Sequence, residues 1–125
     1  MSAPVILVAD DDDDILFLVT TRLRRDGHEV VSASRGDDAL ALAREVKPTL
    51  AVLDVGMPGL DGLEVLEQIR ADETLRATKV LLLTAKAQES DVRRGYAVGA
   101  DAYVKKPFSP AALSERVREL LGGSS

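Results

Sequence analysis

The sequence predicts an α/β domain built on one doubly wound parallel sheet of five strands, with five helices. Short runs of aliphatic and β-branched residues alternate along the chain with segments in which apolar residues recur at helical spacing. Two of the runs, "LAVL" at 50–53 and "VLLL" at 80–83, are apolar at every position. Such runs are typical of strands that helices cover on both faces, which is the arrangement in parallel sheets.

The predicted strands are short and are separated by turn-forming residues. Glycine, proline or aspartate interrupts the pattern in "RDGHE", "VKPT", "GMPGLDG", "VGAD" and "KKPFSP". The strands predicted between these turns are Val5–Ala9, Glu29–Ala33, Thr49–Leu53, Lys79–Leu83 and Ala102–Val104.

Each strand is followed by a predicted amphipathic helix with one buried stripe. The stripes are Ile15, Leu18, Val19 and Leu23 in the first helix, Ala39, Leu42, Ala43 and Val46 in the second, Leu63, Leu66 and Ile69 in the third, Val92 and Tyr96 in the fourth, and Leu113, Val117 and Leu120 in the fifth.

Length and composition narrow the class of protein. At 125 residues we expect a single domain over 1–125, with a core at about 5–121 and "GGSS" at 122–125 as a flexible tail or the start of a linker. The net charge of −5 argues against a surface that binds nucleic acid or anionic membranes. The absence of cysteine excludes disulfides and thiolate metal sites. No apolar run approaches the about 20 residues of a membrane span, and no signal peptide is evident, so we expect a cytoplasmic protein.

Polar residues follow four of the five predicted strands. In a doubly wound sheet, ligands bind at the carboxyl ends of the strands, so these residues are expected at one common edge. They are Asp10 and Asp11 after the first strand, Asp54 after the third, Thr84 after the fourth, and Lys105 and Lys106 after the fifth.

This set of side chains predicts a site for a metal ion and a phosphoryl group. Two carboxylates about 4 Å apart repel by roughly 4 kcal/mol at an effective dielectric constant of 20, so the cluster is expected to recruit a cation. An all-oxygen site at an open edge suits Mg²⁺. With Lys106 to neutralise charge and Thr84 to donate a hydrogen bond, a phosphoryl group fits beside the ion. A carboxylate is also able to receive that group as a nucleophile, which forms an acyl phosphate.

Four motifs, "ILVADD", "VLDVGMPGLDG", "LLLTA" and "GADAYVKKPF", resemble in order and spacing those of the receiver domains of bacterial two-component response regulators. The resemblance covers 5–121. It implies a flavodoxin-like fold with strand order 2-1-3-4-5 and a phosphorylation-dependent signalling switch. It further implies that a histidine kinase or histidine phosphotransfer protein donates the phosphoryl group. The family is not one of turnover enzymes, although phosphoryl transfer is self-catalysed and slow autodephosphorylation follows.

The resemblance also assigns roles to individual residues near the phosphoacceptor. Asp54 matches the phosphoacceptor, and Asp10 and Asp11 match the acidic pair that binds Mg²⁺, with Asp11 as the better candidate for direct coordination. Asp54 and the backbone carbonyl of Gly56 complete the metal ligands. Gly56 and Lys86 match positions that flank the path of the hydrolytic water and tune the lifetime of the phosphoryl group.

Three further residues match the switch of the family. Lys106 matches the lysine that pairs with the phosphoryl group, and its bond to Pro107 is expected to be cis. Thr84 matches the switch hydroxyl, and Tyr103 matches the aromatic residue that follows it, although Tyr103 also fits a simple core position. The switch is expected to alter the partner surface formed by the fourth helix, fifth strand and fifth helix.

Other polar residues have structural interpretations. Asp12–Asp14 are expected to start the first helix, where carboxylates cap free N–H groups and complement the helix dipole. An EF-hand is excluded because Ile15 and Thr21 occupy the positions that need glycine and glutamate. Asp61 is expected to cap the third helix. His28 has no second histidine as a partner, and we expect no function for it.

The sequence lacks residues that two other function classes require. A haloacid dehalogenase-type phosphatase needs a second acid where Gly56 stands, and a dinucleotide site needs a glycine-rich turn in place of "DDDDD". A pseudo-receiver, which binds a protein without being phosphorylated, is the alternative. An effector protein or a covalently linked output domain is expected downstream. A phosphorylation-dependent homodimer is possible, but Ala97 and Ala102 replace the acids through which relatives form a salt-bridged dimer, so that form is in doubt.

Overall fold

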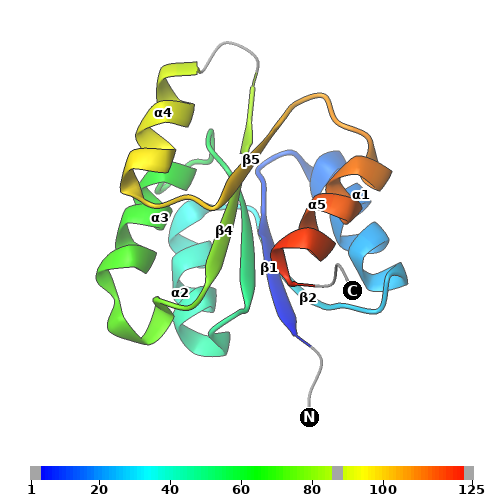
Figure 1. Cartoon of the computed structure of the whole chain (residues 1–125), viewed down its shortest axis with the longest axis horizontal. Helices are drawn as coiled ribbons and strands as arrows, with labels where there is room; N and C mark the ends of the chain where they lie inside the picture. Colours follow the sequence, from blue (N-terminus) through cyan, green and yellow to red (C-terminus); the bar gives the residue numbers. More distant parts are fainter. Residues whose placement is uncertain (1–3, 86–88, 123–125) are drawn as a thin grey trace.

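The computed structural model describes residues 4–85 and 89–122, without the side chains of 89–92. Five parallel strands form one sheet in the order β2-β1-β3-β4-β5 (Figure 1). The predicted fold class and strand order are therefore confirmed. The strands are β1 (Val5–Ala9), β2 (Glu29–Ala33), β3 (Leu50–Asp54), β4 (Lys79–Thr84) and β5 (Ala102–Lys105).

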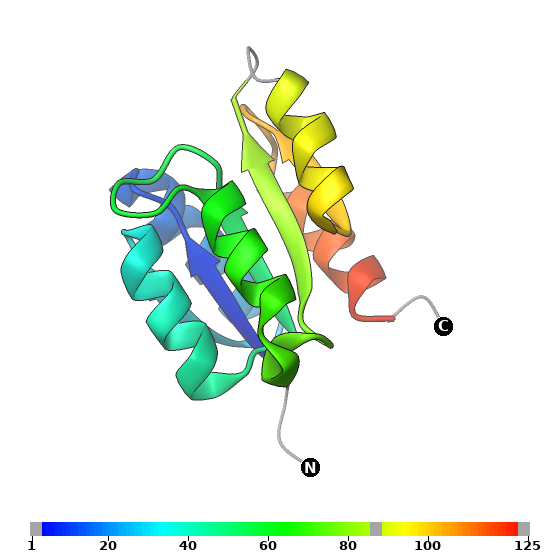
Figure 2. The ribbon, with the colours of Figure 1, turned by 90° about the vertical axis from the view of Figure 1, so that its left-hand side faces the viewer.

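Helices cover both faces of the sheet. Helices α2, α3 and α4 lie on one face and α1 and α5 on the other (Figure 1), and Figure 2 shows α2, α3 and α4 side by side. The helices are α1 (Asp13–Arg25), α2 (Gly36–Val46), α3 (Gly62–Ala71), α4 (Glu89–Val98) and α5 (Pro110–Leu120), with a short 3₁₀ helix η1 (Glu73–Leu75) after α3.

The core consists of two layers, one on each face of the sheet. Successive strand residues point to opposite faces, so Leu7 and Leu53 pack toward α2 and α3 while Ile6 and Val52 pack toward α1 and α5. All four side chains are fully buried. The strands are apolar at every position because each face has its own helix layer to pack against.

Three strands run further toward their carboxyl ends than the sequence predicts. β3 begins at Leu50 rather than Thr49 and includes Asp54, which pairs in register with Leu83; β4 and β5 extend to Thr84 and Lys105, which pair with each other. Backbone pairing continues because a polar side chain at the sheet edge leaves the backbone N–H and C=O groups able to bond. Asp54 and Thr84 are therefore fixed by the sheet itself.

Aspartates cap two helices, as predicted. The Asp12 carboxylate accepts hydrogen bonds from the N–H groups of Asp14 and Ile15 at the start of α1. Asp61 and Glu64 form a reciprocal capping box at the start of α3. The run of five aspartates therefore divides into a capping part and the two acids that precede it.

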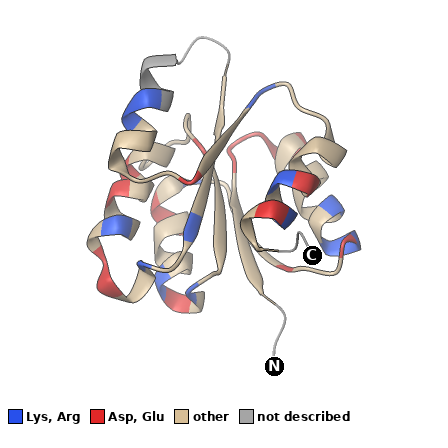
Figure 3. Ribbon diagram, viewed as in Figure 1, with Lys and Arg blue, Asp and Glu red and all other residues tan. Residues whose placement is uncertain are grey.

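Charged residues of both signs are distributed over the helices and loops, whereas the strands carry few of them (Figure 3). Among the described residues, none of the helices combines the length and the apolar character that crossing a membrane requires.

Candidate functional site

The carboxyl ends of β1, β3 and β5 bring two acids and one lysine into direct contact. Lys106 Nζ lies 3.0 Å from Asp10 Oδ2 and 3.2 Å from Asp54 Oδ1. Asp10 is fully buried and Asp54 is 5% exposed. The structure therefore unites residues from strands that are far apart in the sequence but end at the same edge.

A third acid joins this pair. Asp10, Asp11 and Asp54 each place one carboxylate oxygen within 4.8 Å of the others. Asp10 Oδ1 accepts a hydrogen bond from Asp12 N–H at 2.9 Å. Asp10 Oδ2 is buried and, among the described residues, makes its ion pair with Lys106 without the geometry of a hydrogen bond. A buried oxygen with spare acceptor capacity inside an all-oxygen cluster fits a hard divalent cation, so this cluster is able to hold a metal such as Mg²⁺.

The electrostatics of the cluster also favour an added cation. Partial burial of the Asp11 carboxyl, its hydrogen bond with Asp54 and the charge of Asp54 together raise the pKa of Asp11, despite the opposing effect of Lys106. Burial lowers the pKa of Lys106, but its close ion pairs with Asp10 and Asp54 outweigh burial and raise the pKa. The lysine is therefore protonated at neutral pH, and the acids retain a mutual repulsion that a divalent ion would relieve.

The two switch candidates lie on β4 and β5, the two strands that follow β3 across the sheet. Thr84 is 1% exposed, and its Oγ1 donates a hydrogen bond to the Ala85 carbonyl at 3.2 Å. Tyr103 is 36% exposed, and its ring meets the Tyr96 ring of α4 edge-on with centroids 5.5 Å apart. The interpretation of Tyr103 as core filling is therefore wrong. Its exposed ring connects β5 with α4 at the surface.

The other residues that the sequence singled out are Gly56, Lys86, Pro107, Lys105 and His28. Gly56 is exposed in the loop after β3, and its N–H donates to Asp54 Oδ1 at 3.3 Å. The bond from Lys106 to Pro107 is cis, as the resemblance implied. Lys86 lies outside the described residues. Lys105 is exposed, and His28 lies before β2, at the amino-terminal ends of the strands and away from the cluster. Neither residue therefore joins the cluster.

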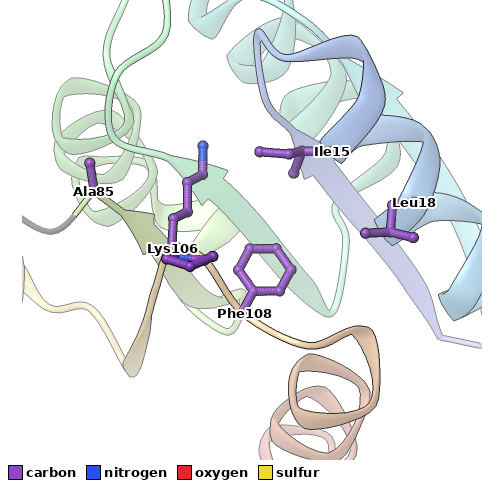
Figure 4. A pocket seen from close by; sticks show the side chains of 6 residues that line it. Ile15, Leu18, Ala85, Lys106 and Phe108 are labelled. Carbon is purple, nitrogen blue, oxygen red and sulfur yellow. The ribbon is translucent and has the colours of Figure 1, made fainter.

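An apolar hollow of about 290 Å³ lies beside Lys106, between α1 and the loop before α5 (Figure 4). The residues that line it are Ile15, Leu18, Ala85, Lys106, Pro107 and Phe108.

The sequence does not predict this hollow, and it predicts burial for Leu18, one of the residues that line it. The helical period predicts that Leu18 belongs to the buried stripe of α1, but Leu18 is 44% exposed, and the neighbouring Phe17 is 72% exposed. Tyr96 of α4 is likewise 44% exposed. Periodicity places Leu18 at the margin of the stripe, where packing by α5 decides its burial. The sequence does carry one sign of an exposed apolar surface here, because the aromatic residue Phe17 lies outside the apolar stripe of α1.

Comparison with known proteins agrees with this geometry. A family model for the response regulator receiver domain matches residues 6–118. The alkaline phosphatase synthesis transcriptional regulatory protein PhoP of Bacillus subtilis is 45% identical over 116 residues, which make up 93% of this chain and 48% of PhoP. Protein PilH of Pseudomonas aeruginosa is 36% identical over 118 residues, which make up 94% of this chain and 98% of PilH. The chain thus spans about half the length of PhoP and of several other relatives.

The solved structures agree with the sequence relatives. The chemotaxis response regulator CheY4 of Vibrio cholerae superposes with a TM-score of 0.89 at 30% sequence identity, over 95% of this chain and 99% of CheY4. The flavodoxin-like fold expected from the resemblance is therefore confirmed by both topology and superposition.

Proposed function

The chain belongs to the family of response regulator receiver domains, and from this premise we propose that Asp54 accepts a phosphoryl group from a histidine kinase or a histidine phosphotransfer protein. The observation that carries the proposal is the contact of Asp54 Oδ1 with Lys106 Nζ at 3.2 Å, inside a cluster of three acids able to hold Mg²⁺. A nearly buried carboxylate fixed beside an ammonium and a metal site is suited to receive a group that carries several negative oxygens.

The chemistry follows from the residues at the edge of the sheet. Asp54 Oδ1 contacts both Lys106 Nζ and Gly56 N–H, which orients the carboxylate toward a donor. Its attack forms an oxygen–phosphorus bond while the nitrogen–phosphorus bond of the donor phosphohistidine breaks, and the donor ring, already protonated on its other nitrogen, leaves as neutral imidazole. Lys106 neutralises charge on the transferred group. When bound by Asp10, Asp11, Asp54 and the Gly56 carbonyl, Mg²⁺ supplies further neutralisation.

The acyl phosphate is proposed to act as a switch. Thr84 ends the strand next to β3 and is proposed to move its hydroxyl toward the phosphoryl oxygens. Tyr103 lies on β5 next to Thr84's strand and contacts Tyr96 of α4. A movement at Thr84 is therefore transmitted to the surface of α4, β5 and α5, where an effector or a linked output domain would bind.

This switch has a direct optical test. The chain has no tryptophan and two tyrosines, Tyr96 and Tyr103, which form the edge-on pair. We expect acetyl phosphate with Mg²⁺ to change the tyrosine fluorescence, because phosphorylation rearranges the contact between these rings. Asp54→Ala is expected to show no change under the same conditions. A phosphorylated protein whose tyrosine signal is identical to that of the unmodified protein would contradict the switch.

The donor is proposed to dock on the apolar surface beside Lys106. Leu18 of α1 is exposed and lines the hollow together with Phe108, and Phe17, its neighbour in the sequence, is exposed as well. Exposed apolar side chains at the margin of a site are typical of a protein contact.

We expect Phe17→Ser to slow phosphoryl transfer from a histidine kinase that labels the wild-type chain by about tenfold, since exposed aromatic residues often anchor interfaces. Labelling by acetyl phosphate, which needs no protein contact, is expected to keep its wild-type rate. Equal slowing with both donors would instead indicate damage to the site.

The wider biology is proposed from the same family. The acidic cluster and Lys106 are all in place, which favours a working receiver over a pseudo-receiver. We propose cytoplasmic action, self-catalysed phosphoryl transfer with slow hydrolysis, and no direct contact with nucleic acid. We propose that the output is either a linked domain or a separate protein, because the matched region makes up 48% of PhoP but 98% of PilH. Ala102 is fully buried and lacks charge, so we propose no homodimer built on that position.

A further inference from the structure

We propose that Gly36, at the start of α2, is a positioning residue for the metal site. It packs against the loop between β3 and α3 and thereby holds the backbone of Gly56, whose carbonyl is proposed as a metal ligand. This inference rests on the proposed function and adds to it a second loop, which comes from a different part of the sheet.

Gly36 contacts the β3–α3 loop through backbone atoms alone. It is buried, and its N–H donates a hydrogen bond to the Pro58 carbonyl at 3.0 Å. A Cβ atom built on Gly36 would lie 1.6 Å from the Leu60 carbonyl oxygen and 2.5 Å from the Leu60 carbonyl carbon. Because these are backbone atoms, no side-chain rotation relieves the clash, and any larger residue must displace the loop.

The beginning and end of the same loop are fixed to the strand that carries the phosphoacceptor. Gly62 N–H donates to the Val55 carbonyl at 3.1 Å, and a Cβ atom on Gly62 would lie 2.5 Å from the Asp54 carbonyl oxygen. Met57 anchors the loop from within, since it is 5% exposed and belongs to the core beneath α2 and α3. Gly36 supplies the contact that fixes the outer half of the loop.

A surface ion pair lies against the same loop. Arg35 Nε donates to Asp37 Oδ1 at 3.1 Å, and this pair lies directly over the backbone of Gly59, where a Cβ atom would meet Asp37 Oδ1 at 2.4 Å. The hydrogen bond from Arg35 lowers the pKa of Asp37, which keeps the pair ionised at neutral pH. The β2–α2 connection therefore covers the loop with both backbone and side-chain atoms.

Gly56 lies between these two sets of contacts. Of the proposed carboxylate ligands, Asp54 lies in β3, and Asp10 and Asp11 are the first two residues after β1, whereas Gly56 is exposed in a loop. The position of a carbonyl ligand in a loop depends on the contacts that hold the loop in place. The contact with Gly36 gives this ligand a fixed position before any ion binds.

The test compares Mg²⁺ binding by the wild-type protein and Gly36→Ala, measured by calorimetry on the folded proteins. We expect Gly36→Ala to weaken Mg²⁺ affinity by about tenfold, the effect typical of residues that orient metal ligands. In the metal-free protein, the amide NMR signals of Gly56 and Gly59 are expected to shift. Alanine is compatible with the first turn of a helix, so the change acts through the loop rather than through α2.

Two control variants separate positioning from general destabilisation. Val117→Ala opens a cavity under α5 on the opposite face of the sheet, so it lowers the melting temperature and is expected to leave Mg²⁺ affinity unchanged. Ser34→Ala changes an exposed side chain in the same connection and is expected to behave like the wild type. If Gly36→Ala does not fold, Asp37→Ala removes the ion pair over Gly59 and is expected to weaken affinity by about twofold to threefold, again with shifted loop signals.

The outcomes distinguish this inference from the proposed function. Wild-type protein that binds no Mg²⁺ would contradict both. Wild-type protein that binds Mg²⁺, with a folded Gly36→Ala that binds equally well and leaves the loop signals unmoved, would overturn the role of Gly36 alone. Equal loss of affinity in Gly36→Ala and a Val117→Ala variant of matched stability would also overturn it.

Discussion

Replacement of Lys106 by methionine is expected to slow phosphorylation by acetyl phosphate by about 10²-fold, even in saturating Mg²⁺. Lys106 Nζ contacts Asp54 Oδ1 at 3.2 Å, so under the proposed function it lies where negative charge would develop on the transferred phosphoryl group. Loss of one preorganised donor at such a position typically costs this much in rate. The measurement is the initial rate at which intact-protein mass increases by one phosphoryl group.

The same substitution is expected to lower stability when no Mg²⁺ is present. It leaves Asp10 and Asp54 buried without their ammonium partner, and we expect the free energy of unfolding to fall by about 2 kcal/mol, less than for a fully buried pair because 20% of the Lys106 side chain is exposed. The folded-state pKa of Lys106 is raised, so its stabilising contribution is fully present below pH 10.5 and is lost only as the pH rises through the folded-state value. Urea unfolding at pH 7.5 therefore measures the full stabilising contribution of Lys106.

Lys105→Met is the matched control, because Lys105 is the exposed neighbour of Lys106 on the other side of the strand. We expect it to change neither the phosphorylation rate nor the stability by more than a surface substitution does. A Lys106→Met variant that is phosphorylated at the wild-type rate would show that Lys106 takes no part in the transfer.

Replacement of Asp11 by asparagine is expected to change stability and Mg²⁺ affinity in opposite directions. The raised pKa of Asp11 means that its charged form is disfavoured in the folded state, so removal of the charge at pH 7.5 is expected to raise the melting temperature of the metal-free protein. Removal of the charge of this proposed ligand is expected to weaken Mg²⁺ binding by roughly tenfold or more. Thermal unfolding and calorimetry with MgCl₂ at constant ionic strength test both effects.

Asp14→Asn provides the control within the same run of aspartates. Asp14 lies in the first turn of α1 and is exposed, so its loss is expected to leave Mg²⁺ affinity unchanged. If Asp11→Asn binds Mg²⁺ as tightly as the wild type, the ion is not held by Asp11.

The fold and the acidic cluster could be predicted because both depend on local patterns. Apolar runs bounded by turns define parallel strands, and parallel strands bring their carboxyl ends to one edge, so Asp10, Asp54 and Lys106 had to lie near each other. The helix caps at Asp12 and Asp61 are equally local, since each acts within one turn of its own helix.

The features that escaped prediction depend on packing between distant segments. Leu18 fits the apolar period of α1, but whether it is covered depends on how closely α5 packs against it. Gly36 reads as an ordinary helix start, and only its approach to the Leu60 backbone shows why it carries no side chain. Arg70 similarly joins α3 to Asp101 at 2.9 Å, across 31 positions in the sequence.

The central claim, that Asp54 is a phosphoacceptor, is tested most directly by intact-protein mass spectrometry after incubation with acetyl phosphate and Mg²⁺. The account predicts a gain of one phosphoryl group in the wild-type protein, and no gain in Asp54→Ala or when the metal is removed with EDTA. Folded wild-type protein that gains no mass would contradict the claim and support the pseudo-receiver alternative. A gain that persists in Asp54→Ala would place the phosphoryl group on another residue.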